Sequence, residues 1–219
     1  MKDFGSTLPP NDVIAIGPIE RLPVILTVEP RAPQPWAQLI AWLYERRSRM
    51  GIVYAPNGAT GRMLVDRLLA IGLAARVFPD PEKPITVLTS GRRSEYGSRE
   101  LDFIVHMFPP VSLEDFRDDL RAAGSSRNVT TSVVFYQLED TSRRDNPYGG
   151  EAIDGASRPS DLDSVLAFLQ TKTCRHRFLM HHFTSSFSAP QDTDEPCGRC
   201  DNCLGRRYYP GDDVRSAPT

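Results

Sequence analysis

Residues 51–78 read GIVYAPNGATGRMLVDRLLAIGLAARVF, and this stretch decides the fold class. The apolar run at residues 52–55 predicts a buried strand, because it is short and continuous. Apolar residues at helical spacing then predict a helix from Gly61 to Ile71, and Thr60 is placed to cap its first turn. A second strand over residues 74–78 completes a β-α-β unit, which is typical of parallel sheets covered by helices.

The same alternation continues on both sides of this unit. Apolar runs predict further strands, and amphipathic spacing predicts further helices. The strands are expected at 24–28, 85–89, 103–108 and 131–136, and the helices at 36–49 and 112–123. We therefore predict an α/β fold: a single trimmed lobe with a mostly parallel sheet.

The connection between the strands at 74–78 and 85–89 is short. It comprises residues 79–84, and its three prolines exclude a helix there. Because a parallel crossover needs about a dozen residues or more, we expect these two strands to be antiparallel or not directly paired.

The spacing of the four cysteines has the most specific chemistry in the sequence. Cys197, Cys200 and Cys203 form a C-x-x-C-x-x-C run, and Cys174 lies upstream of them. Four thiolates in this pattern can close a tetrahedral metal site, so we predict a structural Zn²⁺. An iron–sulfur cluster and a set of disulfides or unliganded thiols are the alternatives.

Three histidines are further candidates for chemistry. His181 and His182 follow Cys174 on the same predicted helix, and we interpret them as packed or surface imidazoles rather than ligands. His106 ends a predicted strand, and the sequence reveals no acid or base partner for it.

Composition sets broad limits on the class of protein. A length of 219 residues allows one domain and a small second one, and 40% apolar residues suffice for a core. A net charge of −2 excludes a strongly basic nucleic-acid binder as judged by bulk charge, but it permits local basic patches. The first residues lack the apolar segment of a signal peptide, and no apolar run reaches membrane-spanning length. We therefore expect a cytoplasmic protein with reduced thiols and no membrane partner.

Clusters of proline, glycine and polar residues predict the domain organisation. Two helices, at 160–170 and 172–183, are expected to form a small helical zinc-binding subdomain after the lobe. The predicted segments are a disordered N-terminus at 1–11, the lobe at 12–138, a linker at 139–159, the zinc-binding subdomain at 160–205 and a disordered tail at 206–219.

Several stretches of the chain resemble RecQ-family DNA helicases, over about residues 14–204. The matching stretches are GIVY at 51–54, FIVHMFP at 103–109, SLEDF at 112–116, CRHRFL at 174–179 and PCGRCDNCL at 196–204. The resemblance implies the second RecA-like lobe of such a helicase, followed by the family's zinc-binding subdomain, a helical platform that holds one structural zinc.

The sequence departs from that family where nucleotide chemistry is carried out. It contains no phosphate-binding G-x-x-x-x-G-K-[ST] loop and no acidic magnesium-binding box at a strand end. The glutamine of the family's last helicase motif falls on Asp118, and the two arginines fall on Ala122 and Ser125. We therefore expect a degenerate, helicase-like chain with no ATP site and no ATPase activity on its own.

Five arginines are candidate contacts to DNA phosphates. Arg92, Arg93 and Arg99 lie in a loop that faces DNA and nucleotide in the family, although a solvated loop is an equal interpretation. Arg175 and Arg177 lie on the helix of the zinc-binding subdomain, where they would hold a phosphate or brace the helix against the preceding lobe.

These features favour a non-catalytic, RecQ-like DNA-binding or scaffold protein with a structural zinc. Its expected partners are DNA and a protein within a larger DNA-processing or genome-defence complex. Two alternatives stay open. One is the second-lobe subunit of a split ATP-dependent DNA helicase, and the other is a protein–protein adaptor that does not bind DNA.

Overall fold

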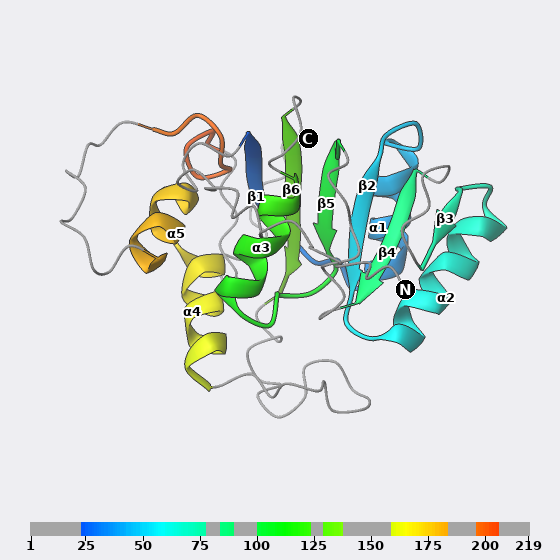
Figure 1. Cartoon of the computed structure of the whole chain (residues 1–219), viewed down its shortest axis with the longest axis horizontal. Coiled ribbons are helices and arrows are strands. Elements are labelled where there is room, and N and C mark those ends of the chain that lie inside the picture. The colour runs from blue at the N-terminus through cyan, green and yellow to red at the C-terminus, as the bar shows by residue number, and fades with distance from the viewer. Residues whose placement is uncertain are drawn as a thin grey trace, which may run out of the picture.

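The computed structural model describes residues 23–77, 84–89, 100–123, 129–137, 159–183 and 196–205. Over these residues the chain forms a six-stranded sheet with helices on both faces (Figure 1). The strands are β1 (Val24–Pro30), β2 (Gly51–Ala55), β3 (Ala75–Arg76), β4 (Ile85–Thr89), β5 (Phe103–His106) and β6 (Thr130–Tyr136). The helices are α1 (Pro35–Tyr44), α2 (Gly58–Ala70), α3 (Leu113–Ala123), α4 (Pro159–Gln170) and α5 (Arg175–Phe183).

Every strand pair in this sheet is parallel, and the strand order is β1-β6-β5-β2-β4-β3. The central strands β2 and β5 are buried along their whole length. Their sequences are nearly continuous apolar runs because helices cover both sides of the sheet. The predicted α/β fold with a mostly parallel sheet is confirmed.

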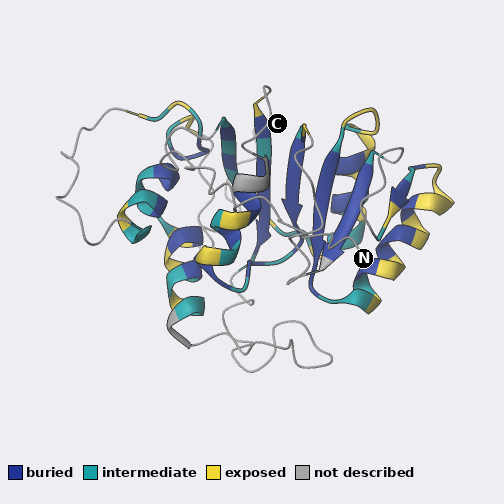
Figure 2. Cartoon of the chain, viewed as in Figure 1, coloured by how far each residue is buried: buried dark blue, intermediate teal, exposed yellow. Residues whose placement is uncertain are grey.

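Successive residues of each strand point to two separate cores, one on each face of the sheet. The α1–α2 face contains Val53 of β2, packed with Leu43 of α1 and Leu64 of α2. The α3–α5 face contains Ile52 of β2, packed in one cluster with Phe116 of α3 and with residues of α4 and α5. Figure 1 shows α3 in front of the sheet and α1 behind it, and Figure 2 shows the buried strands between them.

The pairing of β3 with β4 differs from the expectation drawn from the sequence. Ala75 lies beside Ile85, and Arg76 beside Thr86, in parallel register. The prediction of antiparallel or absent pairing was therefore wrong. The reason is the length of β3, which has two residues. The connection from the end of β3 back to the start of β4 has to cover only the length of two strand residues, roughly 7 Å. No helical crossover is therefore needed.

The start of α2 also differs from the prediction. The helix begins at Gly58, and Asn57 rather than Thr60 is its N-cap. The Asn57 side-chain oxygen accepts a hydrogen bond from the Thr60 N–H at 2.8 Å, which satisfies one of the exposed donors of the first turn. At the other end, Gly72 has a φ of +78° and follows the helix as predicted.

The helix α1 is shorter than the predicted 36–49 and ends at Tyr44. Two arginines within the predicted range instead follow the helix, and their side chains bind its terminal carbonyls. The guanidinium of Arg46 donates to the Trp42 carbonyl at 3.0 Å, and that of Arg47 donates to the Tyr44 carbonyl at 3.2 Å. Their charge also complements the negative end of the helix dipole.

The predicted domain boundaries stay predictions. The N-terminus at 1–11 and the tail at 206–219 lie outside the described residues, as does the linker at 139–159 apart from its last residue. Among the helices described, none is both long and apolar enough to cross a membrane.

Candidate metal centre

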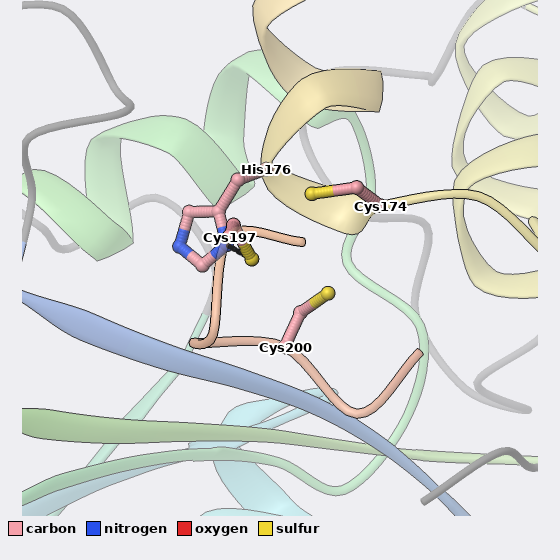
Figure 3. Close-up of side chains that lie close together, drawn as sticks. All are labelled: Cys174, His176, Cys197 and Cys200. Carbon is pink, nitrogen blue, oxygen red and sulfur yellow. Dashed lines mark hydrogen bonds between the residues drawn. The ribbon is translucent and has the colours of Figure 1, made fainter. Parts of the chain in front are cut away.

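Four potential metal ligands converge where the start of α5 meets the loop at residues 196–205. Cys174 immediately precedes α5, His176 lies in its first turn, and Cys197 and Cys200 come from the loop. Their ligand atoms, three Sγ atoms and one imidazole nitrogen, all lie within 4.8 Å of one another. Figure 3 shows these side chains turned toward one another. We call these four residues the ligand cluster.

The backbone of the cysteine loop is turned tightly enough to bring its sulfurs together. Gly198 has a φ of +66°, a conformation that favours glycine, so this residue, which directly follows Cys197, permits the turn. The Arg199 N–H then donates to Cys197 Sγ at 3.3 Å, and the Leu204 N–H donates to the Cys200 carbonyl at 2.8 Å. Successive cysteines can therefore face one ion.

The side chains of the ligand cluster shift one another's pKa values. A hydrogen bond from Cys200 lowers the pKa of Cys174 to about 4, against the opposing effect of burial. Burial raises the pKa of Cys197 to about 11, and the hydrogen bond to Cys174 together with burial raises the pKa of Cys200. Burial also lowers the pKa of His176. An anionic thiolate and a neutral imidazole are the forms in which these side chains bind a cation.

The donor set fits a zinc ion. Thiolate sulfur and imidazole nitrogen are the ligands of structural zinc sites, and they are softer donors than Mg²⁺ or Ca²⁺ prefers. All four cysteines are free thiols in this structure, so the disulfide alternative is not supported. Zinc bound here would cross-link α5 to the cysteine loop and would supply folding energy rather than reaction chemistry.

A buried ion pair holds the cysteine loop against the helices. Arg175 and Asp201 form two parallel hydrogen bonds, with Nε to Oδ1 at 2.5 Å and Nη2 to Oδ2 at 2.9 Å. The third guanidinium nitrogen donates to the carbonyls of Phe168 and Leu169 at the end of α4, at 2.8 and 3.2 Å. Asp201 also accepts from the Val28 N–H of β1 at 3.0 Å. One charged pair therefore connects α4, α5, the loop and the sheet.

This ion pair corrects one predicted DNA contact. Arg175 is 0% exposed, so its guanidinium is not accessible to a DNA phosphate. The alternative interpretation, in which it braces the helix against the lobe, agrees in part: the guanidinium binds α4 and Asp201 of the cysteine loop, and Asp201 in turn accepts from β1 of the lobe. Arg177 is partly buried on the same helix and stays a predicted contact. The other three candidates, Arg92, Arg93 and Arg99, lie outside the described residues.

The cysteine loop also continues the sheet at its β1 edge. The Leu26 N–H donates to the Arg199 carbonyl at 2.9 Å, and the Asp201 N–H donates to the Leu26 carbonyl at 3.0 Å. These bonds form an isolated parallel bridge between Leu26 and Cys200. Since β1 ends the strand order, the loop supplies hydrogen-bond partners to an edge that the sheet itself leaves open.

Sequence reasoning missed His176 as a member of the ligand cluster. The signal was its position two residues after Cys174, a C-x-H spacing that is too common to be noticed alone.

The other two histidines of this helix lie elsewhere, as interpreted: His181 is exposed, and His182 Nε2 lies 3.6 Å from Glu114 Oε1. Cys203 is half-buried, and its thiol hydrogen-bonds with Cys174. The four-cysteine ligand set stays a prediction.

A second polar pair lies on the α3–α5 face, away from the cysteines. His106 Nε2 at the end of β5 lies 3.0 Å from Asp119 Oδ2 of α3, and both side chains are buried. The His106 ring stacks on Tyr54, with 4.6 Å between the ring centres. The sequence did not reveal this acid partner. Because the pair is closed to solvent, it fixes α3 on the sheet and offers no substrate site.

Comparison with known proteins also identifies a zinc-binding region in this part of the chain. Residues 140–204 match the family model described as RecQ zinc-binding. ATP-dependent DNA helicase RecQ of Pasteurella multocida is 21% identical over 192 residues, which cover 78% of this chain and 29% of that protein. RecQ of Haemophilus influenzae is 21% identical over 210 residues, covering 86% and 32%. The chain thus spans about a third of the length of these relatives.

The chain also has partial similarity to solved structures, among them a DEAD box protein from Methanococcus jannaschii. Its TM-score is 0.47 at 14% identity, over 54% of this chain and 37% of that one. The C-terminal domain of a possible DNA helicase from Lactobacillus plantarum has a TM-score of 0.35 at 12% identity, over 55% and 83%.

The predicted resemblance is therefore confirmed for both parts of the molecule. The cysteine loop and the helices α4 and α5 lie within the region that matches the zinc-binding family model, and the longer matches to RecQ helicases extend over the sheet. The chain is thus similar to RecQ helicases over most of its length, and it combines a parallel-sheet lobe with a region similar to the RecQ zinc-binding family.

Proposed function

We propose that this chain is a non-catalytic, RecQ-like protein that binds DNA or holds a partner on it, with zinc in a structural role. The observation that carries the proposal is the way the ligand cluster is built into the fold. His176 and Cys200 are buried, the loop pairs with β1, and the Arg175–Asp201 pair ties the loop to α4 and α5. Such a closed site stabilises a surface rather than exposing an ion to substrate.

The described part of α3 supports the absence of phosphoryl-transfer chemistry. The family's last helicase motif maps onto this helix, where Asp118 takes the glutamine position and is exposed. The neighbouring Arg117 lies over the Phe183 ring at 4.5 Å and contacts Asp118 at 3.3 Å. An arginine that reaches a transferred phosphate contributes about a thousandfold or more to rate. Arg117 instead packs α3 against α5.

A local basic segment supports binding to nucleic acid. Between Arg31 and Arg76 the sequence has seven arginines and only two carboxylates, a net charge of +5 in a chain whose net charge is −2. Arg47 and Arg49 are exposed just after α1, and Arg47 lies over the Tyr44 ring at 5.0 Å. Exposed arginines beside an exposed aromatic ring are the side chains that single-stranded nucleic acids contact.

The experiment that tests the proposal is a DNA-binding titration of the zinc-loaded chain at about 50 and 200 mM salt, combined with an ATPase assay. We expect binding that weakens steeply with salt, and ATP turnover no greater than the buffer background. No binding even at low salt would favour the adaptor function. ATP turnover by the chain alone would overturn the non-catalytic assignment, and turnover only with a separate first lobe would favour a split helicase.

Charge variants sharpen the same titration. Replacing Arg47 and Arg49 together by Gln should reduce the slope of binding against salt by about one for each phosphate that these arginines neutralise. The matched control is Glu45→Gln on the same surface, which removes a negative charge and should tighten binding. If the arginine variant and Glu45→Gln changed DNA binding in the same way, this surface would not contact DNA. We also propose that the chain has a protein partner within a larger complex and that it acts in the cytoplasm.

A further inference from the structure

The imidazole of His176 is held in the orientation of a metal ligand. Its Nε2 lies 3.1 Å from the Val24 carbonyl of β1. Because a carbonyl can only accept a hydrogen bond, Nε2 carries the proton and Nδ1 keeps its lone pair. Nδ1 lies 3.5 Å from Cys197 Sγ, on the side of the ligand cluster. Metal-binding histidines are oriented in this way, with the distal ring nitrogen donating to a carbonyl or carboxylate.

The spacing between Nδ1 and the sulfur also fits shared binding of one ion. Zinc–sulfur bonds of about 2.3 Å and zinc–nitrogen bonds of about 2.0 Å place sulfur and nitrogen about 3.5 Å apart in a tetrahedral site. The observed distance between Cys197 Sγ and His176 Nδ1 is 3.5 Å. The sulfurs of Cys174 and Cys200 complete a set whose members all lie within 4.8 Å of one another.

Cys203 gives the site one more donor than a tetrahedral ion needs. Its thiol hydrogen-bonds with Cys174 and with Cys200, so it also borders the cluster. Cys203 is half-buried, as are Cys174 and Cys197, whereas Cys200 and His176 are buried. Four thiols and one imidazole therefore surround four coordination positions, and Cys203 is the thiol outside the set of ligand atoms that all lie within 4.8 Å of one another.

We propose that His176 Nδ1 is a reserve ligand, which occupies the fourth position of the metal when Cys203 does not. The three sulfurs of the ligand cluster and this nitrogen then hold the ion without Cys203. The hydrogen bond to Val24 keeps Nδ1 in place in both arrangements, so no refolding is required. The centre thereby tolerates the loss of the Cys203 thiolate, which a site with Cys203 as an obligatory donor would not. This behaviour does not depend on whether the chain binds DNA.

The test uses Co²⁺ as a spectroscopic probe in the full chain. We expect Cys203→Ala to bind one Co²⁺ in tetrahedral geometry, with a thiolate-to-cobalt charge-transfer band reduced to that of three sulfurs. Adding His176→Gln should then weaken binding by more than about 100-fold, beyond the cost typical of a residue that only orients a ligand. Glutamine keeps an N–H toward the Val24 carbonyl and removes Nδ1. The control is Cys203→Ala with His181→Gln, which changes an exposed histidine of the same helix and should behave like Cys203→Ala alone.

A second measurement keeps the proposal testable if the double variant fails to fold. In zinc-loaded Cys203→Ala, histidine ring ¹⁵N NMR should show Nδ1 of His176 bound to metal and Nε2 protonated. Loss of the ion in Cys203→Ala, or a His176 ring with unliganded nitrogen shifts in that variant, would overturn the proposal. So would equal Co²⁺ affinities of Cys203→Ala with and without His176→Gln.

Discussion

The two faces of the sheet are stabilised by different physical means. The α1–α2 face is a continuous apolar core, in which residues such as Leu43 and Leu64 are fully buried. The α3–α5 face combines an apolar cluster with a buried ion pair, a buried His–Asp pair and the ligand cluster. The α1–α2 face therefore depends mainly on apolar packing. The α3–α5 face also depends on charges that are costly to bury unless they are paired, and it carries side chains that fit a metal ion.

The largest expected effect comes from removing the metal. Cys200→Ser should unfold the cysteine loop and release α5, because sites of this kind contribute about 10 kcal/mol or more to folding. Hydrogen exchange should show loss of protection in β1 and α5, while β2 and α2 stay protected. A chelator added to the unaltered chain is the control and should give the same pattern. A variant that kept its metal and its melting temperature would contradict the assignment of this ligand.

The next effect concerns the buried ion pair. Arg175→Met should lower the free energy of unfolding by about 3–5 kcal/mol, because it leaves the Asp201 carboxylate buried without its partner. Urea denaturation of the zinc-loaded protein measures this change. The matched double variant, Arg175→Met with Asp201→Leu, should recover part of the loss, since neither charge is then left alone. If the double variant lost as much stability as the two single changes added together, the pair would not be coupled.

A change on the opposite face should act on stability alone. Leu43→Ala removes a side chain that is 0% exposed and should cost about 2–5 kcal/mol, from lost burial and the cavity left behind. Zinc affinity, measured in the folded state, should be unchanged because Leu43 belongs to the other core. A large drop in zinc affinity would show that the two faces are energetically linked through the sheet.

The smallest expected effect is at the start of α2. Asn57→Ala removes the cap that binds the Thr60 N–H and should cost about 1 kcal/mol. Thermal unfolding detects this change, and Asn57→Ser should restore most of the stability because serine is also a good N-cap. Destabilisation by both variants to the same extent would assign a different role to this side chain.

The sequence predicts local structure and ligand chemistry better than it predicts tertiary contacts. The apolar run of β2 and the C-x-x-C-x-x-C spacing identified the parallel sheet and the cysteine site, because both signals lie within a few neighbouring residues. The role of Arg175 was not predictable in this way. Its partner Asp201 is 26 residues away in the chain, and its burial arises only when α4, the loop and β1 meet.

Two other differences between the predictions and the structure have equally specific physical reasons. The rule for parallel crossovers assumes strands of ordinary length, and it failed for β3 because that strand has two residues. His176 escaped notice because a histidine two residues after a cysteine has no meaning until the fold brings Cys197 beside it. His106 similarly gained an acid partner only when α3 packed on the sheet.

The bridge between Leu26 and Cys200 has a consequence for how the protein fails. When the ion is lost, the cysteine loop no longer shields the outer side of β1, and a row of backbone amides and carbonyls becomes available to other chains. Self-association through this strand should then compete with refolding. Light scattering after chelation would detect it as a concentration-dependent rise, and a stable monomeric apoprotein would argue against it. The ion would thus keep the protein soluble as well as folded.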